Sequence, residues 1–298
     1  MKRTAVLVIG LFLLGACHSE AAPVSTPSPA VVETTPDEAR VPLPVATSIE
    51  KIAETMTPTE DTRSTITIVY DNYAYDPRLR TDWGFAALVE YRDQVVLFDT
   101  GGDGQVLLDN TSALGIDPTH VEAVILSHIH GDHTGGLSAL LDTGVRPTVY
   151  LPPSFPNSFK RQLGEVTTVV EVTPGQAIAE GLFTTGEMGS GIREQALVIQ
   201  AGRGLVVVTG CAHPGVTEMV AQAKELSGEP VYLVLGGFHL GSKGDTQIEA
   251  IIASFREMGV ARVAPCHCTG DRAIAMFEAE YGDDFIQAGV GTEIILEE

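Results

Sequence analysis

Short runs of apolar residues, separated by glycine, proline and polar residues, recur along the chain from Ser64 onward. The runs are rich in valine, isoleucine and leucine, and their length is typical of buried strands rather than of helices. The predicted strands cover residues 65–70, 85–91, 94–100, 121–127 and 148–152, and then 166–172, 195–201, 204–210, 230–236 and 261–266.

Helical spacing of apolar residues follows several of these strands, at 137–142, 214–227, 245–258 and 270–280. In each half of the chain a strand-rich stretch comes first, and alternation of strands with helices comes after it. This order favours mixed β-sheets that pack together with helices outside them.

The N-terminus has a different pattern. Lys2 and Arg3 precede an apolar run over 5–14, and small residues follow it, which is typical of an export signal. The apolar run is shorter than the roughly 20 residues that a membrane-spanning helix needs. It ends in the letters LGAC at 14–17, which resemble the lipobox of bacterial lipoproteins.

This resemblance implies that residues 1–16 are a signal peptide and that Cys17 is the lipidated first residue of the mature chain. Residues 17–63 are rich in proline, alanine and threonine and are predicted to be a disordered tether. The folded domain is then 64–298. We expect an exported protein of the bacterial cell envelope that contacts the membrane only through its lipid. His18 slightly favours the outer membrane, and a plain secretory signal is the alternative.

The net charge limits the partners. The chain has 39 acidic and 18 basic residues, for a formal net charge of -21. Such a charge repels a phosphate backbone, so nucleic acid is excluded as a bulk partner. A small anionic substrate is still compatible with the sequence, because bound metal ions invert the sign of the local potential.

Most histidines of the domain directly follow a predicted strand. His128 and His130 follow the fourth strand, and His213, His239 and His267 follow later strands. Strand ends at one edge of a sheet can hold side chains in a common crevice. The sequence therefore predicts that these histidines meet at one site.

The densest group of ligand residues is SHIHGDHTGG, at 127–136. His128 and His130 lie two positions apart and lean to one side of an extended loop, while Asp132 and His133 can turn toward a second ion. Neutral imidazole is the commonest nitrogen ligand of zinc, and carboxylate fills the harder positions. A hydrogen-bonded polar turn is the alternative, and it is disfavoured because all four side chains follow an apolar strand.

The order His-x-His-x-Asp-His resembles the motif of the metallo-β-lactamase superfamily. More narrowly, residues 65–298 resemble the branch named dihydropterin-ribofuranosylaminobenzene-phosphate synthase-like hydrolases. The further motifs that carry this resemblance are YDN (70–72), WGFAALVEY (83–91), LFDTGG (97–102), TGCAHPG (209–215), GGFHL (236–240) and PCHCTG (265–270). The resemblance implies an α+β fold, a four-layer αββα sandwich with a metal crevice along one edge.

The resemblance also implies a ligand set in two parts. His128, His130 and His213 would hold a first ion, and Asp132, His133 and His267 a second ion. Asp99 would support the site from behind these ligands. Cys266 and Cys268, on either side of His267, are expected to pack away from it.

Two positions stay open. Where much of the superfamily has a bridging aspartate after Thr-Gly, this chain has Cys211, which is either a thiolate ligand or a buried neighbour. If Cys211 takes the bridging position, Glu194 could replace His213 at the first ion. His239 fits either a ligand or an acid/base group that faces the substrate.

These features favour a metal-dependent hydrolase with two divalent ions. Zinc suits imidazole-rich ligation best, and manganese or iron fits the same donors. A bound ion lowers the pKa of water from near 16 toward about 7, and a second ion neutralises charge that develops on the substrate. Asp132 would position the nucleophile, and His239 would protonate the leaving group. The expected substrate is a small ester, lactone or phosphoester.

Two other functions are compatible with the motifs. The first is an iron-dependent oxidoreductase of the same fold, although the di-iron branch has glutamate where this chain has His130. The second is a tethered lipoprotein that binds metal without catalysis, which the intact ligand loop disfavours. Between the first two predicted strands, Trp83, Tyr73, Tyr75, Arg78 and Arg80 would offer substrate contacts if their loop covers the crevice, and a plain surface loop is the alternative.

Overall fold

The structure is a computed structural model that describes residues 64–297. The predicted signal peptide at 1–16, the lipidation site Cys17 and the predicted tether at 17–63 lie outside the described residues. Within residues 64–297, every helix is too short or too polar to cross a membrane.

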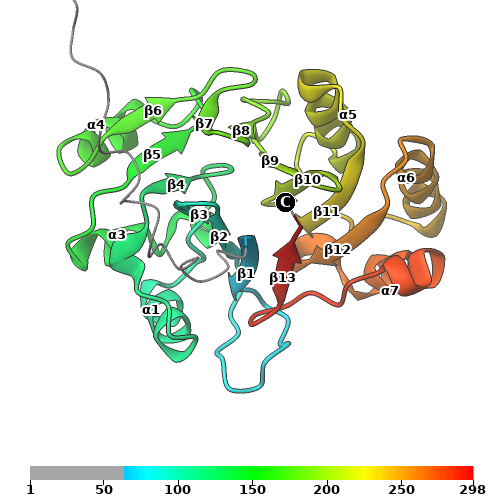
Figure 1. Cartoon of the computed structure of the whole chain (residues 1–298), viewed down its shortest axis with the longest axis horizontal. Coiled ribbons are helices and arrows are strands. Elements are labelled where there is room, and N and C mark those ends of the chain that lie inside the picture. Colours follow the sequence, from blue (N-terminus) through cyan, green and yellow to red (C-terminus); the bar gives the residue numbers. More distant parts are fainter. Residues whose placement is uncertain (1–63, 298) are drawn as a thin grey trace, which may run out of the picture. The chain divides into compact units, whose positions relative to one another are not determined.

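Two mixed β-sheets form the centre of the domain (Figure 1). In the first sheet the strand order is β13-β1-β2-β3-β4-β5-β6, and in the second it is β12-β11-β10-β9-β8-β7. The first sheet contains β1 (Ser64–Tyr70), β2 (Ala86–Tyr91), β3 (Gln94–Phe98), β4 (Ala123–Ile125), β5 (Thr148–Leu151), β6 (Val169–Glu171) and β13 (Glu293–Leu296). The second contains β7 (Ala177–Ala179), β8 (Leu182–Thr184), β9 (Leu197–Ala201), β10 (Gly204–Thr209), β11 (Val231–Gly237) and β12 (Arg262–Cys266).

The strands that lead to the candidate site run in parallel. β3, β4 and β5 pair in parallel in the first sheet, with Phe98 opposite Ile125. In the second sheet β10, β11 and β12 also pair in parallel, with Thr209 opposite Gly236. The loops after these strands therefore start at the same edge of each sheet.

Both faces of each sheet are buried, which explains why the strands have apolar residues at nearly every position. Ile66, Phe98, Val206 and Leu235 belong to the core between the two sheets. The alternate positions, such as Leu97 in β3 and Val207 in β10, face the helices instead. Burial on two faces favours such continuous apolar runs.

Helices cover the outer face of each sheet (Figure 1). On the first sheet lie α1 (Gly104–Ala113), α3 (Leu137–Asp142) and α4 (Asn157–Gly164), and on the second lie α5 (Val216–Ser227), α6 (Asp245–Glu257) and α7 (Asp271–Tyr281). The shorter elements are α2 (Gly131–Thr134) and the 3-10 turns η1 (Pro118–His120), η2 (His267–Thr269) and η3 (Gly282–Asp284). The domain is a four-layer αββα sandwich, which confirms the predicted fold class.

Candidate metal centre

The structure brings the predicted ligands together at the edge where the parallel strands end. His128 and His130 follow β4, Asp132 and His133 lie on α2, and the remaining ligands follow strands of the second sheet: Cys211 and His213 after β10, His239 after β11, and His267 at the end of β12. Three groupings of side chains have the compactness of a metal site, and Cys211 belongs to all of them; the third consists of Cys211, His239 and Cys268.

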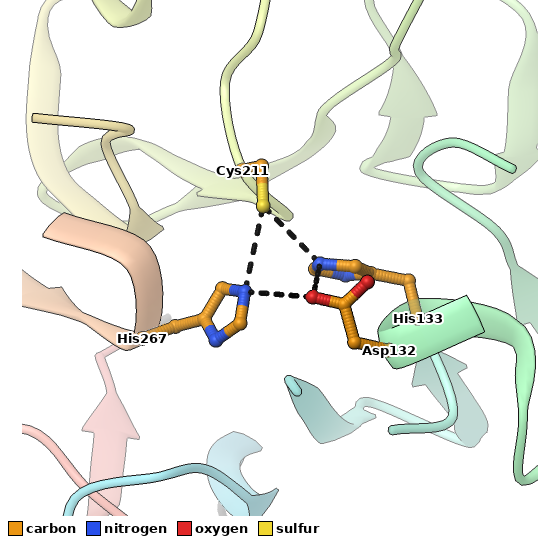
Figure 2. A group of neighbouring side chains, drawn as sticks. All are labelled: Asp132, His133, Cys211 and His267. Carbon is orange, nitrogen blue, oxygen red and sulfur yellow. Dashed lines mark hydrogen bonds and ion pairs between the residues drawn. The ribbon is translucent and has the colours of Figure 1, made fainter. Parts of the chain in front are cut away.

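The first grouping contains Asp132, His133, Cys211 and His267 (Figure 2). The Sγ atom of Cys211 lies 3.3 Å from Nε2 of His133 and 3.4 Å from Nε2 of His267. Asp132 Oδ2 lies 3.6 Å from each of the same two nitrogens. Two imidazoles, a carboxylate and a thiol therefore face one small space, and these are the donor types that zinc prefers.

The second grouping contains His128, Cys211 and His213, whose donor atoms all lie within 4.8 Å of one another. His130 borders it, because its ring centroid lies 4.7 Å from that of His128 and 4.9 Å from that of His213. The Nε2 atom of His128 is buried and has no hydrogen-bond partner among the described residues. A buried nitrogen without a partner is costly, and a metal ion at this position would satisfy it.

Hydrogen bonds fix the orientation of the histidines on the first sheet. Nδ1 of His133 lies 2.7 Å from Asp99 Oδ2, and Nδ1 of His128 lies 2.9 Å from the hydroxyl oxygen of Ser127. The Ser127 hydroxyl in turn donates to Asp99 Oδ2 at 2.6 Å. Asp99 thus supports both rings, and each ring keeps the lone pair of Nε2 for the space between the ligands.

Glu194 has the same role on the second sheet. Its side chain is fully buried, and its carboxylate accepts hydrogen bonds from the backbone N–H groups of four consecutive residues, Gly210 to His213. It also accepts from Nδ1 of His213 at 2.9 Å. Five N–H groups therefore occupy this carboxylate. The alternative in which Glu194 replaces His213 as a ligand is not supported, because Glu194 positions His213 instead.

Asn72 positions His267, and the sequence analysis did not assign it this role. Its Oδ1 atom lies 2.9 Å from Nδ1 of His267, and its Nδ2 donates to the carbonyl oxygen of the same residue at 3.3 Å. The two residues are 195 positions apart. The signal that could have indicated Asn72 is its place in the YDN motif.

Comparison with known proteins agrees with this geometry. Residues 84–221 match the model of the metallo-beta-lactamase superfamily. The chain carries a metallo-β-lactamase domain. It is homologous to the 7,8-dihydropterin-6-methyl-4-(beta-D-ribofuranosyl)-aminobenzene-5'-phosphate synthase of Methanocaldococcus jannaschii, with 28% identity over 275 residues, which is 76% of this chain and 94% of that protein.

Solved structures share the fold of this metallo-β-lactamase domain. The crystal structure of Tm1679, described as a metal-dependent hydrolase of the beta-lactamase superfamily, is 29% identical and superposes with a TM-score of 0.69 over 79% of this chain and all (100%) of that one. The metallo-beta-lactamase fold protein YhfI of Bacillus subtilis is 16% identical, with a TM-score of 0.60 over 78% of this chain and 99% of its own. The second likeness concerns the fold alone.

The electrostatics of the metallo-β-lactamase domain suit cation binding. Burial lowers the pKa of His128 and of His267 to about 2, so both imidazoles are neutral at physiological pH. Burial opposes the ionisation of Glu194, but the hydrogen bond with His213 and the other N–H donors outweigh it and lower the pKa of Glu194 to about 2. Burial also lowers the pKa of His133, but the Asp99 carboxylate outweighs it and raises that pKa to about 9. The site therefore combines two neutral imidazoles, those of His128 and His267, with a Glu194 carboxylate that stays ionised.

Several residues of the site adopt the left-handed backbone conformation, which is unfavourable outside glycine. Asp99, Ala212, His239 and His267 have φ angles of 56°, 58°, 53° and 50°. Each such residue costs on the order of 1 kcal/mol, and such conformations concentrate at functional sites. At Asp99, His239 and His267 the backbone thereby departs from the extended conformation of the preceding strand.

The structure corrects one prediction about the cysteines. Cys266 packs in the core between the sheets, as expected. Cys268 instead faces the site: its Sγ and a ring nitrogen of His239 lie within 4.8 Å of Cys211 Sγ, and its thiol donates to the Cys211 carbonyl oxygen at 3.6 Å. The reason is that the chain turns into η2 at His267, so the alternation of a strand does not continue.

The loop between β1 and β2, which contains Asn72, also reaches the site through Trp83. The ring centroid of Trp83 lies 5.0 Å from that of His267, and the Trp83 side chain is 56% exposed. Arg78 and Arg80 pair with Asp76 and Asp109, and Tyr73 donates to Asp271. Of these predicted contacts, Trp83 is the one placed against a proposed ligand.

Proposed function

We propose that this protein is a metal-dependent hydrolase with two divalent ions, zinc in preference to manganese or iron. The observation that carries the proposal is the shared orientation of the histidines. Nδ1 of His128, His133, His213 and His267 is in each case engaged by a fixed partner, which leaves Nε2 for the space between the ligands. Such anchoring of the opposite ring nitrogen is typical of metal-binding histidines.

We assign His128, His130 and His213 to a first ion, and Asp132, His133 and His267 to a second. Cys211 lies in both groupings and is proposed as a thiolate ligand. The bound ions would lower the pKa of water toward neutrality and polarise the scissile bond of the substrate. The description of Tm1679, which is 29% identical, supports hydrolysis.

The residues around the ligands have distinct roles in this proposal. Asp132, whose side chain is 21% exposed, would orient the attacking water through its carboxylate. His239 is exposed at the mouth of the site, and its ring centroid lies 4.5 Å from that of His213. A hydrogen bond with Cys268 raises the pKa of His239, so this side chain can hold the proton that a leaving group needs. We propose a small ester, lactone or phosphoester as the substrate.

The test compares His128→Ala and Asp132→Ala with His120→Ala, an exposed histidine on η1. We expect the first two variants to lose activity on a panel of chromogenic esters, lactones and phosphoesters. They should also lose bound metal while circular dichroism shows an intact fold. His120→Ala should keep both properties. Full activity in either site variant would refute the assignment.

The metal content of the purified protein separates the two competing functions. Bound iron with visible colour and no hydrolysis would indicate an oxidoreductase. Full loading with zinc or manganese and no turnover would indicate a protein that binds metal without catalysis.

We also propose that the protein is exported and anchored through a lipid on Cys17. The support is the apolar run at 5–14 followed by LGAC. Mass spectrometry of the N-terminal peptide should detect diacylglycerol on Cys17, and Cys17→Ala should move the protein from the membrane fraction to the soluble fraction. An unmodified Cys17 at a cleaved N-terminus would contradict the proposal.

A further inference from the structure

A cavity of about 310 Å³ opens beside the proposed metal centre. His213 and His239 form the wall on the side of the proposed ligands, and the cavity extends between the loop after β10 and the loop after β11. Its other walls combine apolar residues, with Pro214, Phe238 and Ile251 among them, and polar ones. A cavity of this size holds a small organic group directly next to the proposed site of bond cleavage.

Lys243 is the cation of this cavity. The other described lysines are engaged, because Lys160 pairs with Glu171 and Lys224 donates to the carbonyl oxygen of Met258. Within residues 64–297, no acidic group lies within ion-pair distance of the Lys243 ammonium. A free cation beside the site is notable in a chain with 39 acidic and 18 basic residues.

Glu218 is the acidic residue of the same cavity, and the start of α5 holds it. Its carboxylate accepts from the Thr217 hydroxyl at 2.7 Å. It also lies so close to Gly215 that a Cβ atom there would approach Glu218 Oε2 to 2.0 Å. A carboxylate in the first turn of a helix is stabilised by the helix dipole. Glu218 therefore has its own partners, and the positive charge of Lys243 is left for a ligand.

We infer that this cavity binds part of the substrate and that Lys243 binds a carboxylate or phosphate group on it. The inference rests on the proposed hydrolase function and narrows the substrate. It predicts a small ester or lactone with an anionic group a few bonds from the cleaved bond and an apolar segment between them. The apolar walls would contact that segment, and the ammonium would neutralise the anion.

Two esters of equal length test the inference. Mono-p-nitrophenyl succinate carries a terminal carboxylate, whereas p-nitrophenyl butyrate ends in a methyl group. In the metal-loaded protein, Lys243→Ala should raise KM for the succinate ester about three- to fivefold, the range expected for one exposed ion pair. KM for the butyrate ester should not change, and Lys243→Arg should restore the preference.

Two further variants separate a local contact from a general charge effect. Arg161→Ala removes an exposed cation on α4, at the other sheet, and should leave both KM values unchanged. Glu218→Gln removes the acidic charge of the cavity and should lower KM for the succinate ester about twofold, since a like charge is lost. The effect of Lys243 should shrink as salt is added.

A measurement of succinate binding at equilibrium tests the anion site even if the protein hydrolyses neither ester. Succinate should raise the melting temperature of the metal-loaded protein more than that of metal-loaded Lys243→Ala. If neither ester is hydrolysed but this difference is present, the proposed function fails and the anion site stands. If both esters are hydrolysed and Lys243→Ala changes KM for the two esters equally, the anion site is refuted and the proposed function stands. If neither hydrolysis nor Lys243-dependent binding occurs, both are refuted.

Discussion

Glu194 Oε2 lies 2.9 Å from Nδ1 of His213 and also 2.9 Å from the backbone nitrogen of the same residue. One buried carboxylate thereby fixes both the backbone and the ring of a proposed ligand. Because Glu194 precedes β9 and His213 follows β10, the position of the ligand depends on the packing of two neighbouring strands.

Glu194→Gln should weaken metal binding without removing any ligand. The glutamine side chain has one acceptor oxygen, whereas the Glu194 carboxylate has two that accept from five N–H groups. The NH₂ group of the glutamine would point at N–H donors and could not accept from them. We expect the metal affinity, measured by competition with a chelator, to fall about 10- to 100-fold. The free energy of unfolding in urea should fall by about 2–3 kcal/mol.

Glu187→Gln is the matched control, because Glu187 lies on the same segment but pairs with Arg193 outside the site. This variant should bind metal like the original protein. An equal loss of affinity in both variants would show that Glu194 has no special role in the centre.

Asn72→Ala should have a similar effect on the second ion. The His267 ring would lose the partner of its Nδ1, so its tautomer and its orientation would no longer be fixed. We expect the chelator competition to show a loss of metal affinity of about 10-fold or more. Asn72→Asp keeps an acceptor at the same place and should retain most of the affinity. Equal losses in the two variants would argue against an orienting role.

Cys211→Ser should change the spectrum of the cobalt-substituted protein. A thiolate bound to cobalt absorbs in the near ultraviolet through charge transfer, and a serine at the same position does not. We expect this absorption in the original protein and in Cys266→Ala, which alters a cysteine of the core. The Cys268→Ser variant measures how much of this absorption comes from the second thiol that faces the site. Unchanged absorption in Cys211→Ser would show that Cys211 is a buried neighbour of the site and not a thiolate ligand.

Removal of the metal should lower stability and change the environment of Trp83. An ion that binds the folded chain alone would stabilise it by about 2.7 kcal/mol when free metal exceeds Kd by 100-fold. Trp83 is the only tryptophan of the sequence, and its ring lies 5.0 Å from His267, so its fluorescence should follow a metal titration. Trp83→Phe should lose this signal and keep the rise in melting temperature. A melting temperature that does not depend on metal would contradict the prediction.

The sequence predicted the parts of the fold that have a clear apolar pattern. Strands β9 to β12 and helices α5 to α7 have nearly the predicted bounds, for example 216–227 for α5 against 214–227. The short strands β7, β8 and β13 were not predicted. Helix α1 was not predicted because Asn110 and Thr111 are buried on the face that also buries Val106 and Leu107. Helix α4 buries a single residue, Leu163, and so has no apolar stripe.

The candidate site was predictable where the ligands follow strands and not where it depends on long-range contacts. The histidines and Cys211 stand out in the sequence because they directly follow apolar runs. The roles of Asn72 and Glu194 depend on partners 195 and 19 positions away. The orientation of Cys268 depends on a turn at His267 that the strand pattern does not indicate.

The proposed ligands of the centre come from both halves of the chain. His128 and His133 belong to the half that forms the first sheet, whereas Cys211 and His267 belong to the half that forms the second. Metal affinity in such a site depends on complete folding, because neither half offers a full set of donors. If the proposed centre binds metal, the amount of metal that stays with the protein through gel filtration would be proportional to the amount of correctly folded protein in a preparation, and this measurement needs no substrate.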